Sequence, residues 1–147
     1  MLTLRLPLTD HAGLGEAAPI IQITIDEHAP ELLAIIDTGA SGSHMPYTWA
    51  STLCHDNNHP KVRKIKTDGV GGLVDSAVHT LQIHALDEDL KRMWSHRPKH
   101  EFLFTKGFAE KWQIVIIGRV IIREWRSFRI HREEGSTRKK QFVEIIF

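Results

Sequence analysis

The sequence predicts a mainly β fold, and three observations carry that prediction. Apolar and polar residues alternate along 2–6 and 19–25, as they do in strands with one buried face. Two nearly continuous apolar runs, at 32–36 and 113–117, are typical of strands buried on both faces. A glycine-rich turn at 69–72 separates two further extended stretches, which indicates a hairpin. A chain of 147 residues with 41% hydrophobic content suits a single domain over 1–147 with one core.

Composition narrows the classes of protein. The balance of 19 Lys and Arg against 18 Asp and Glu gives no general affinity for polyanions. The single cysteine, Cys54, excludes an intramolecular disulfide and suits a reducing compartment. The first residues contain no long apolar run, so we expect neither a signal peptide nor a membrane span. We therefore expect a soluble, cytoplasmic protein with no membrane partner.

The first third of the chain leads to one carboxylate. Residues 1–18 form a lead with one strand and a glycine-containing loop, and 19–25 and 32–36 form a hairpin around a polar turn. An ionised carboxylate has no favourable place within a doubly buried strand, so Asp37 is expected at its end. Thr38 and Gly39 favour a tight loop there. Such a loop is a catalytic arrangement, although Asp-Thr-Gly alone also fits an ordinary turn with a solvated Asp.

The segment after this loop is less regular. Residues 47–53 fit a short strand or one helical turn, and 56–60 form a loop by composition. Cys54, His55 and His59 are possible zinc ligands, but no second Cys/His pair stands at zinc-finger spacing. We expect surface-loop histidines here and no metal site.

The middle of the chain predicts a long hairpin. Residues 61–67 alternate basic and apolar residues, and 73–84 form the partner strand. The glycine-rich tip can bend and can bring backbone groups against an extended ligand; an exposed turn without function is the alternative. Its residues are Gly69, Val70, Gly71 and Gly72.

The third quarter of the chain changes period twice. Within 87–100, Leu90, Met93 and Trp94 have helix-like spacing, which indicates a short amphipathic helix or an insertion. Residues 101–105 return to strand, and 106–111 form a loop or one turn. Apolar positions in 118–125 then suit a short helix packed on the sheet.

The C-terminal segment 127–147 reads as a hairpin that ends in an apolar strand. In a monomer we expect that strand to be an exposed sheet edge, which invites pairing with another chain; a core contact is the alternative. Its apolar residues are Phe142, Val143, Ile145, Ile146 and Phe147. The basic cluster at 138–140 is expected to be a solvated turn and not a nucleic-acid site, because no aromatic platform accompanies it.

Three blocks in this order resemble the retropepsins, the single-domain aspartic proteases of retroviruses and their cellular relatives. The blocks are Asp37-Thr38-Gly39-Ala40, the glycine-rich turn at 69–72, and the strand that ends at Gly118-Arg119. The resemblance covers about residues 19–125. It implies a closed β fold with a flap hairpin and one short C-terminal helix, completed as a homodimer.

The resemblance also assigns roles to individual residues. It implies that Asp37 from each subunit forms the catalytic pair and that Thr38 ties the two loops together across the dimer axis. The residues matched to substrate contacts are Ile35, Gly39, Ala40, Ser41, Gly69, Val70, Gly71, Gly72 and Ile116. The terminal strands of retropepsin subunits interleave, which makes Phe142, Val143, Ile145, Ile146 and Phe147 candidates for the dimer interface.

Two positions depart from the family pattern. Ser41 stands where retropepsins usually carry an acid, and Val120 stands where Asp or Asn follows Gly-Arg. In many members that acid pairs with the arginine matched by Arg119, so Arg119 is expected to have another partner or a less rigid setting.

The count of carboxylates decides the predicted function. Aspartic-type peptide hydrolysis needs two carboxyl groups that share one proton, and the chain has a single Asp-Thr-Gly. A two-fold dimer would supply Asp37 twice. We therefore predict an aspartic endopeptidase, most active in mildly acidic conditions, that acts on a peptide or protein substrate without metal or cofactor. The alternatives are an inactive dimer that binds peptide, and a nucleic-acid accessory protein that uses the basic C-terminal hairpin.

Overall fold

The computed structural model describes residues 2–147 except 16–17, 28–29, 70–71, 98 and 132–140. The strands and helices described are β1 (Thr3–Pro7), β2 (Ile20–Ile25), β3 (Leu32–Ile36), β4 (Ser43–Pro46), the 3-10 turn η1 (Tyr47–Trp49), β5 (Lys64–Gly69), β6 (Gly72–Leu81), β7 (Ile83–Leu86), β8 (Arg92–Ser95), β9 (His100–Thr105), α1 (Phe108–Trp112), β10 (Val115–Ile117), α2 (Arg119–Ile122), β11 (Ser127–His131) and β12 (Phe142–Ile146). The prediction of a mainly β fold is confirmed. Within the described residues, neither α-helix is long and apolar enough to cross a membrane.

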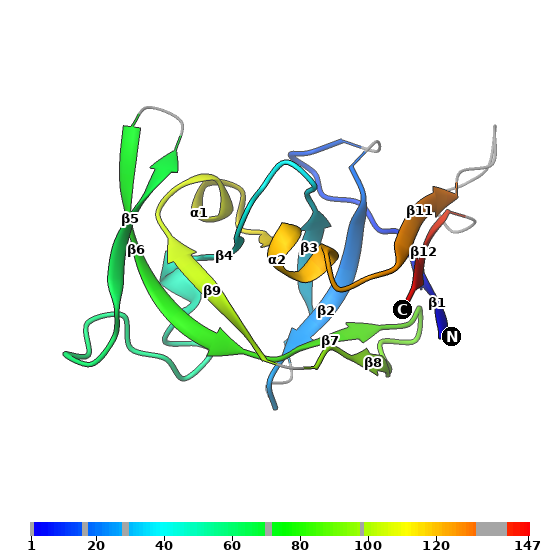
Figure 1. Ribbon diagram of the computed structural model, residues 1–147, viewed down its shortest axis with the longest axis horizontal. Helices are drawn as coiled ribbons and strands as arrows, with labels where there is room; N and C mark the ends of the chain where they lie inside the picture. The colour runs from blue at the N-terminus through cyan, green and yellow to red at the C-terminus, as the bar shows by residue number, and fades with distance from the viewer. Residues whose placement is uncertain (1, 16–17, 28–29, 70–71, 98, 132–140) are drawn as a thin grey trace.

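Two sheets make up the molecule. Nine strands form one sheet in the order β5-β6-β9-β4-β10-β3-β2-β7-β8, and three form the other in the order β1-β12-β11. The nine-strand order is linear, so the described strands of this sheet do not close on themselves. Figure 1 shows the β5–β6 hairpin at one end of the molecule and the three-stranded sheet at the other.

The two apolar runs lie side by side at the centre of the large sheet. β10 pairs with β3 in parallel, with Ile116 opposite Ile35 and Ile117 opposite Ile36. β2 pairs antiparallel with β3, as the predicted hairpin requires. The three residues of β10 are all buried, which agrees with a strand covered on both faces. Because the two strands are parallel and in register, both end at the same edge of the sheet.

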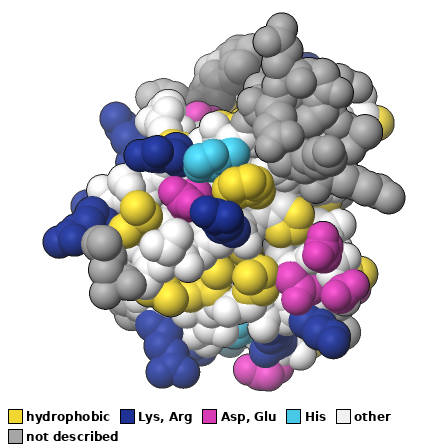
Figure 2. All heavy atoms as spheres, turned by 90° about the vertical axis from the view of Figure 1, so that its right-hand side faces the viewer, with side chains coloured by type: hydrophobic (Ala, Val, Ile, Leu, Met, Phe, Trp, Pro, Cys, Tyr) yellow, Lys and Arg dark blue, Asp and Glu magenta, His cyan; other side chains and the backbone are white. Residues whose placement is uncertain are grey.

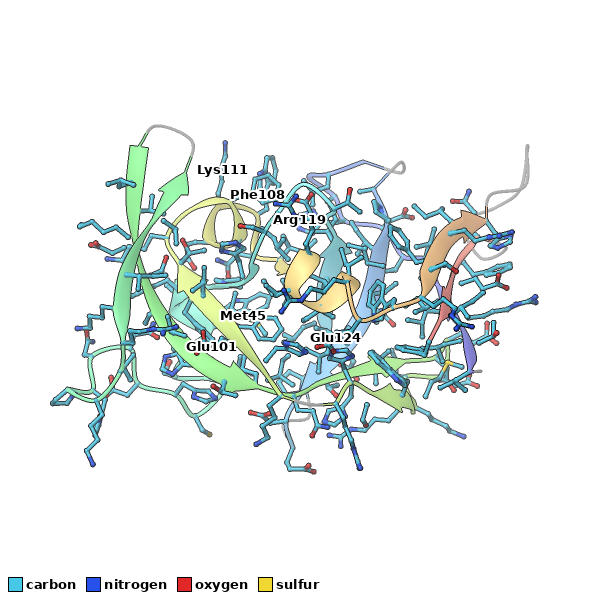
Figure 3. All side chains as sticks on the ribbon, viewed as in Figure 1. Met45, Glu101, Phe108, Lys111, Arg119 and Glu124 are labelled. Atoms are coloured by element: carbon cyan, nitrogen blue, oxygen red, sulfur yellow. The ribbon has the colours of Figure 1, made fainter. Side chains whose placement is uncertain are left out.

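One hydrophobic core joins the two sheets. Leu4 and Leu6 of β1 and Val143 and Ile145 of β12 belong to the same buried cluster as the large sheet's side chains. Met45 of β4, labelled in Figure 3, is fully buried in this cluster. The N-terminal lead is therefore part of the core.

β12 is not the sheet edge expected of a monomer. It is the central strand of its sheet, antiparallel to β1 on one side and to β11 on the other. The reason is the alternation along β1, which buries Leu4 and Leu6 and so places β1 against β12. The edges of this sheet are β1 and β11.

The helix expected within 87–100 is also wrong. Residues 92–95 form β8, which pairs antiparallel with β7. In the turn between these strands, the Asp87 carboxylate accepts hydrogen bonds from the N–H groups of Asp89 and Lys91, both at 2.9 Å. Of the three residues that suggested an apolar helix face, Leu90 and Met93 are each 45% exposed, and only Trp94 of β8 packs against the core. Their spacing therefore does not report a buried face.

The other predicted elements are present. The β5–β6 hairpin is present, with Gly69 opposite Gly72 at its described end, but the strand predicted over 73–84 is divided between β6 and β7. The α2 helix follows Gly118, η1 and the turns after it occupy 47–54, and α1 occupies the segment expected to be a loop or one turn. β11 and β12 form the predicted C-terminal hairpin, while the basic cluster at 138–140 lies outside the described residues.

Candidate active site

Asp37 lies directly after β3 and continues its pairing with β10. Its backbone N–H donates to the carbonyl oxygen of Ile117 at 2.9 Å. The Oδ1 atom of its carboxylate accepts a hydrogen bond from the N–H of Gly39 at 2.8 Å. The side chain is partly exposed. The loop thus orients the carboxylate and leaves it accessible.

Backbone hydrogen bonds tie this loop to the start of α2. The N–H of Arg119 donates to the Ala40 carbonyl at 2.8 Å, and the N–H of Val120 donates to the Ser41 carbonyl at 3.2 Å. The buried N–H of Gly118 donates to Ser43 Oγ at 3.0 Å. Two segments separated by about half the chain are therefore held together at the end of the β3–β10 pair.

Gly118 is required by this close approach. A Cβ atom at position 118 would lie 2.0 Å from the carbonyl oxygen of Gly42 and 2.9 Å from that of Ala40. Both atoms belong to the backbone and cannot turn aside. The absence of a side chain at 118 is therefore what allows the loop and α2 to meet.

The Arg119 side chain is exposed and makes no ion pair with the described residues. Figure 3 shows Arg119 at α2. This agrees with the expectation of a less rigid setting, because Ser41 offers no carboxylate. Backbone hydrogen bonds and the hydrogen bond from the Gly118 N–H to Ser43 Oγ hold the loop against the helix here.

Asp37 opens into a cleft of about 770 Å³. Five residues singled out from the sequence line it, namely Asp37, Gly39, Ala40, Ser41 and Ile116. The rest of the described lining comes from four places. These are the loop and β4 with Gly42 and His44, the β5–β6 hairpin with Lys66, Thr67 and Val74, β9 with Leu103 and Thr105, and the α1 region with Gly107, Phe108 and Ala109. Phe108, labelled in Figure 3, is 40% exposed. The cleft thus combines a carboxylate with apolar walls.

The remaining residues predicted for the site either do not line the cleft or lie outside the described residues. Thr38 is exposed and Ile35 half-buried, and neither is among the residues that line the cleft. Gly69 and Gly72 pair at the end of the hairpin, where Gly72 has a φ of +127° that favours glycine. Val70 and Gly71 lie outside the described residues.

Sequence reasoning missed His44. This residue of β4 lines the cleft, and burial lowers the pKa of its imidazole while the nearby Asp37 carboxylate raises it less. The ring is therefore neutral near pH 7. The four-residue strand that carries it is too short to show a period, and only its position seven residues after Asp37 could have drawn attention to it.

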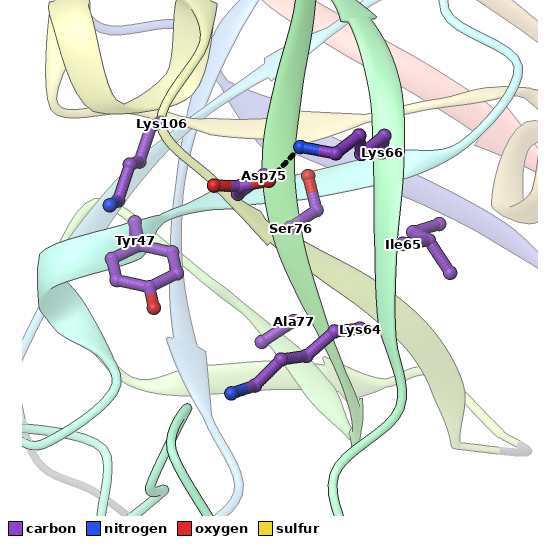
Figure 4. A pocket seen from close by; sticks show the side chains of 8 residues that line it. All are labelled: Tyr47, Lys64, Ile65, Lys66, Asp75, Ser76, Ala77 and Lys106. Carbon is purple, nitrogen blue, oxygen red and sulfur yellow. Dashed lines mark hydrogen bonds and ion pairs between the residues drawn. The ribbon is translucent and has the colours of Figure 1, made fainter.

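A smaller hollow of about 330 Å³ lies beside the β5–β6 hairpin (Figure 4). Lys66 of β5 donates to the Asp75 carboxylate of β6 at 2.7 Å, and this hydrogen bond is the main reason that the pKa of Asp75 lies below its ordinary value. Lys106 Nζ stands 4.7 Å from the centre of the Tyr47 ring. Lys66 also lines the cleft, so its ion pair with Asp75 holds the Lys66 ammonium group between the two hollows.

The cleft supplies one carboxylate from this chain. Asp37 is the only acidic residue among the described residues that line it, and His44 is the only histidine. This lining offers no trio of metal-ligating side chains. Cys54, His55 and His59 likewise form no such trio in the described part of the chain.

Comparison with known proteins gives a likeness of fold. No family model and no curated protein matches this sequence. The crystal structure of a retropepsin-like aspartic protease from Rickettsia conorii superimposes with a TM-score of 0.62 and 15% sequence identity, over 99% of this chain and 91% of that one. At this identity the likeness shows the fold and not the activity. The chain therefore has a retropepsin-like fold with Asp37 in its cleft.

Proposed function

We propose that this protein is an aspartic endopeptidase that works as a homodimer, with Asp37 from each subunit forming the catalytic pair. The observation that carries the proposal is the setting of Asp37. It lies at the end of the parallel β3–β10 pair, in a loop fixed by backbone hydrogen bonds, and it opens into a cleft of about 770 Å³. The likeness of fold to a retropepsin-like aspartic protease supports it.

The dimer follows from the chemistry. Acid–base hydrolysis of a peptide bond by carboxyl groups needs one to accept a proton and one to donate. The described lining of the cleft holds a single carboxylate, so a second copy of the chain must provide the other. When the two carboxyl groups lie side by side, they share one proton, because two neighbouring negative charges are unfavourable.

Each group then has a defined part in the reaction. The ionised carboxylate takes a proton from a water molecule as its oxygen attacks the scissile carbonyl carbon. The protonated carboxyl group hydrogen-bonds the carbonyl oxygen and stabilises the charge that develops there. The N–H of Gly39 donates to Asp37 Oδ1, which fixes the carboxylate orientation before substrate enters. Collapse of the tetrahedral intermediate passes a proton to the leaving amine.

Recognition of the substrate would use both walls of the cleft. An extended peptide is bound through backbone hydrogen bonds and alternating side-chain pockets, here with Ile116, Leu103 and Phe108 as apolar surface. The hairpin ending in Gly69 and Gly72 would close over it as a flap.

For the subunit interface we propose the partly exposed residues Thr38, Phe142, Ile146 and Phe147. Val143 and Ile145 are fully buried in this subunit's own core and would support the interface from beneath. Figure 2 shows the end of the molecule that carries β1, β11 and β12, where hydrophobic side chains form a band among charged ones. Such a mixed surface is typical of protein interfaces.

The test is peptide-library profiling by mass spectrometry between about pH 4 and pH 7, where a proton-sharing carboxyl pair can act. The wild type should cleave, and Asp37→Asn should not, although it should remain folded and dimeric. Asp89→Asn, in the exposed β7–β8 turn, is the matched control and should cleave as the wild type does.

Two results would contradict the proposal. Cleavage that survives in Asp37→Asn would place the activity elsewhere. No cleavage by any variant, together with tight peptide binding by the wild-type dimer, would identify a peptide-binding module instead.

A further inference from the structure

Three side chains from three different parts of the chain converge on one point near the end of α2. His96 follows β8, His100 begins β9 and Glu124 follows α2. The Nε2 atoms of His96 and His100 lie 2.9 Å apart, and Glu124 Oε2 lies 3.0 Å from the first and 3.2 Å from the second. The three ligand atoms therefore form a nearly equilateral triangle. Figure 3 shows Glu124 below α2.

Hydrogen bonds alone do not account for this triangle. Each imidazole Nε2 has a single in-plane N–H or lone pair, so it can be directed at only one partner. Here each Nε2 has two polar neighbours at hydrogen-bond distance, namely the other Nε2 and the same carboxylate oxygen. Nδ1 of His96 is buried and has no hydrogen-bond partner among the described residues. Within the described residues, the ring of His96 therefore has polar contacts only with the other two members of the triangle.

The dimensions fit a transition-metal cation. Ligand atoms about 2.0–2.1 Å from a tetrahedral zinc ion lie about 3.3–3.4 Å from one another. The observed separations of 2.9–3.2 Å need to widen by only a few tenths of an ångström. Two imidazoles and one carboxylate are a ligand set that suits zinc, and they disfavour calcium and magnesium, which prefer oxygen ligands.

The ligands are held before any cation arrives. The His96 side chain is 3% exposed; its backbone N–H donates to the Ile83 carbonyl at 2.9 Å, and its carbonyl accepts from the Gln82 side chain at 3.2 Å. The Glu124 side chain is 34% exposed, so one side of the triangle reaches solvent. A cation could enter there and keep a water molecule as its fourth ligand.

We propose that His96, His100 and Glu124 form a binding site for a divalent transition-metal ion, with zinc the best fit. The cation would join the β8–β9 connection to the segment between α2 and β11, and so would link the large sheet to the three-stranded sheet. This role is structural and separate from the cleft, because none of the three residues lines it. The proposal does not depend on the proposed protease activity.

The test uses the full-length protein, stripped with a chelator, and Zn²⁺ alone as the probe. We expect one zinc ion per chain by calorimetry, and a melting temperature about 5–10 °C higher when free zinc is about 100 times the Kd. Glu124→Gln and His100→Gln should each weaken binding at least about 100-fold, since even changes behind the ligands cost 10–100-fold. Co²⁺ should give the visible absorption of a tetrahedral site.

His59→Gln and Cys54→Ser are the matched controls, because both residues are exposed potential ligands outside the triangle. Each should bind zinc as the wild type does. The Glu124 side chain is partly exposed, and His100 lies at the start of β9. At least one of the variants Glu124→Gln and His100→Gln is therefore expected to keep the wild-type circular dichroism spectrum.

Two outcomes would overturn the proposal. One is a wild-type protein that shows no binding and no thermal shift, which would leave the triangle as a proton-sharing cluster. The other is binding that persists in folded Glu124→Gln or His100→Gln, or that is lost in the two control variants.

Discussion

His44 and Asp37 line the same cleft, so a ligand side chain placed beside the carboxylate also meets an imidazole. Burial lowers the pKa of His44 more than Asp37 raises it. The ring is neutral near pH 7 and gains a positive charge only as the pH falls below its lowered pKa. The selectivity of the cleft should therefore change as the pH falls through the lowered pKa of His44.

Replacement of His44 tests this directly. His44→Leu should shift the library cleavage profile toward apolar side chains in the adjoining subsite, while the wild type should accept acidic side chains better at a pH below the lowered pKa of His44 than at about pH 7. The variant should lose that pH dependence. His59→Leu, at an exposed loop position, is the control. Identical profiles for His44→Leu and the wild type at both pH values would contradict a role for His44 in selectivity.

Among single residues, those placed by a local motif could be predicted from the sequence. Those brought together by the packing of distant segments could not. Asp37 and Gly39 could be predicted because the apolar run and the turn that place them are continuous in the chain. His44 and the group of His96, His100 and Glu124 depend on which strands become neighbours. The spacing of His96 and His100 was the only local signal for the triangle, and nothing local linked it to Glu124.

Among the elements, the junction between the loop at 37–42 and α2 has the least room for added atoms. Gly118→Ala places a methyl group against the Gly42 and Ala40 carbonyl oxygens, so it should lower the free energy of unfolding by about 1–3 kcal/mol or more. Gly42→Ala on the facing loop is the matched control, since its nearest neighbour is 3.5 Å away. Urea denaturation measures both, and equal stability of the two variants would contradict the steric argument.

The elements themselves were largely predictable where period and burial agree. β2 and β10 follow from apolar runs that are largely buried in the folded protein, whereas the β5–β6 hairpin follows from the glycine-rich turn between two extended stretches. β8 was not predictable, because Leu90 and Met93 have helix-like spacing although both are exposed, so the spacing does not mark the buried face of a helix. The position of β12 depended on β1, which lies at the other end of the chain.

For the whole molecule, the proposed dimer makes the inactive variant an inhibitor. A mixed dimer of wild type and Asp37→Asn has one carboxyl group and cannot share a proton between two. With free exchange of subunits, a threefold excess of Asp37→Asn should reduce wild-type activity to about a quarter. The same excess of an unrelated protein should have no effect. Activity that is unchanged by the variant would indicate that each subunit acts alone.

The buried histidines predict how stability depends on pH. Burial is the largest cause of a lowered pKa at His44, His79 and His84. The unfolded chain, with ordinary histidine pKa values near 6.5, therefore binds more protons than the folded one as the pH falls below that value. The free energy of unfolding should thus decrease as the pH drops from about 7.5 to about 5.5. Urea denaturation with a chelator present measures this, and a stability that rises over the interval would contradict it.

The pairing of β1 with β12 also bears on how the chain folds. Arg5 and Glu144, partners in this ladder, are 139 positions apart, and the N–H of Phe147 donates to the Leu2 carbonyl at 3.0 Å. Contacts between such distant positions slow folding, because a long loop must close before they form. During synthesis Leu4, Leu6 and Leu8 have no partner strand until β12 is made, although all three are buried in the finished molecule. β1 is synthesised before β12, so it is expected to pair late in folding.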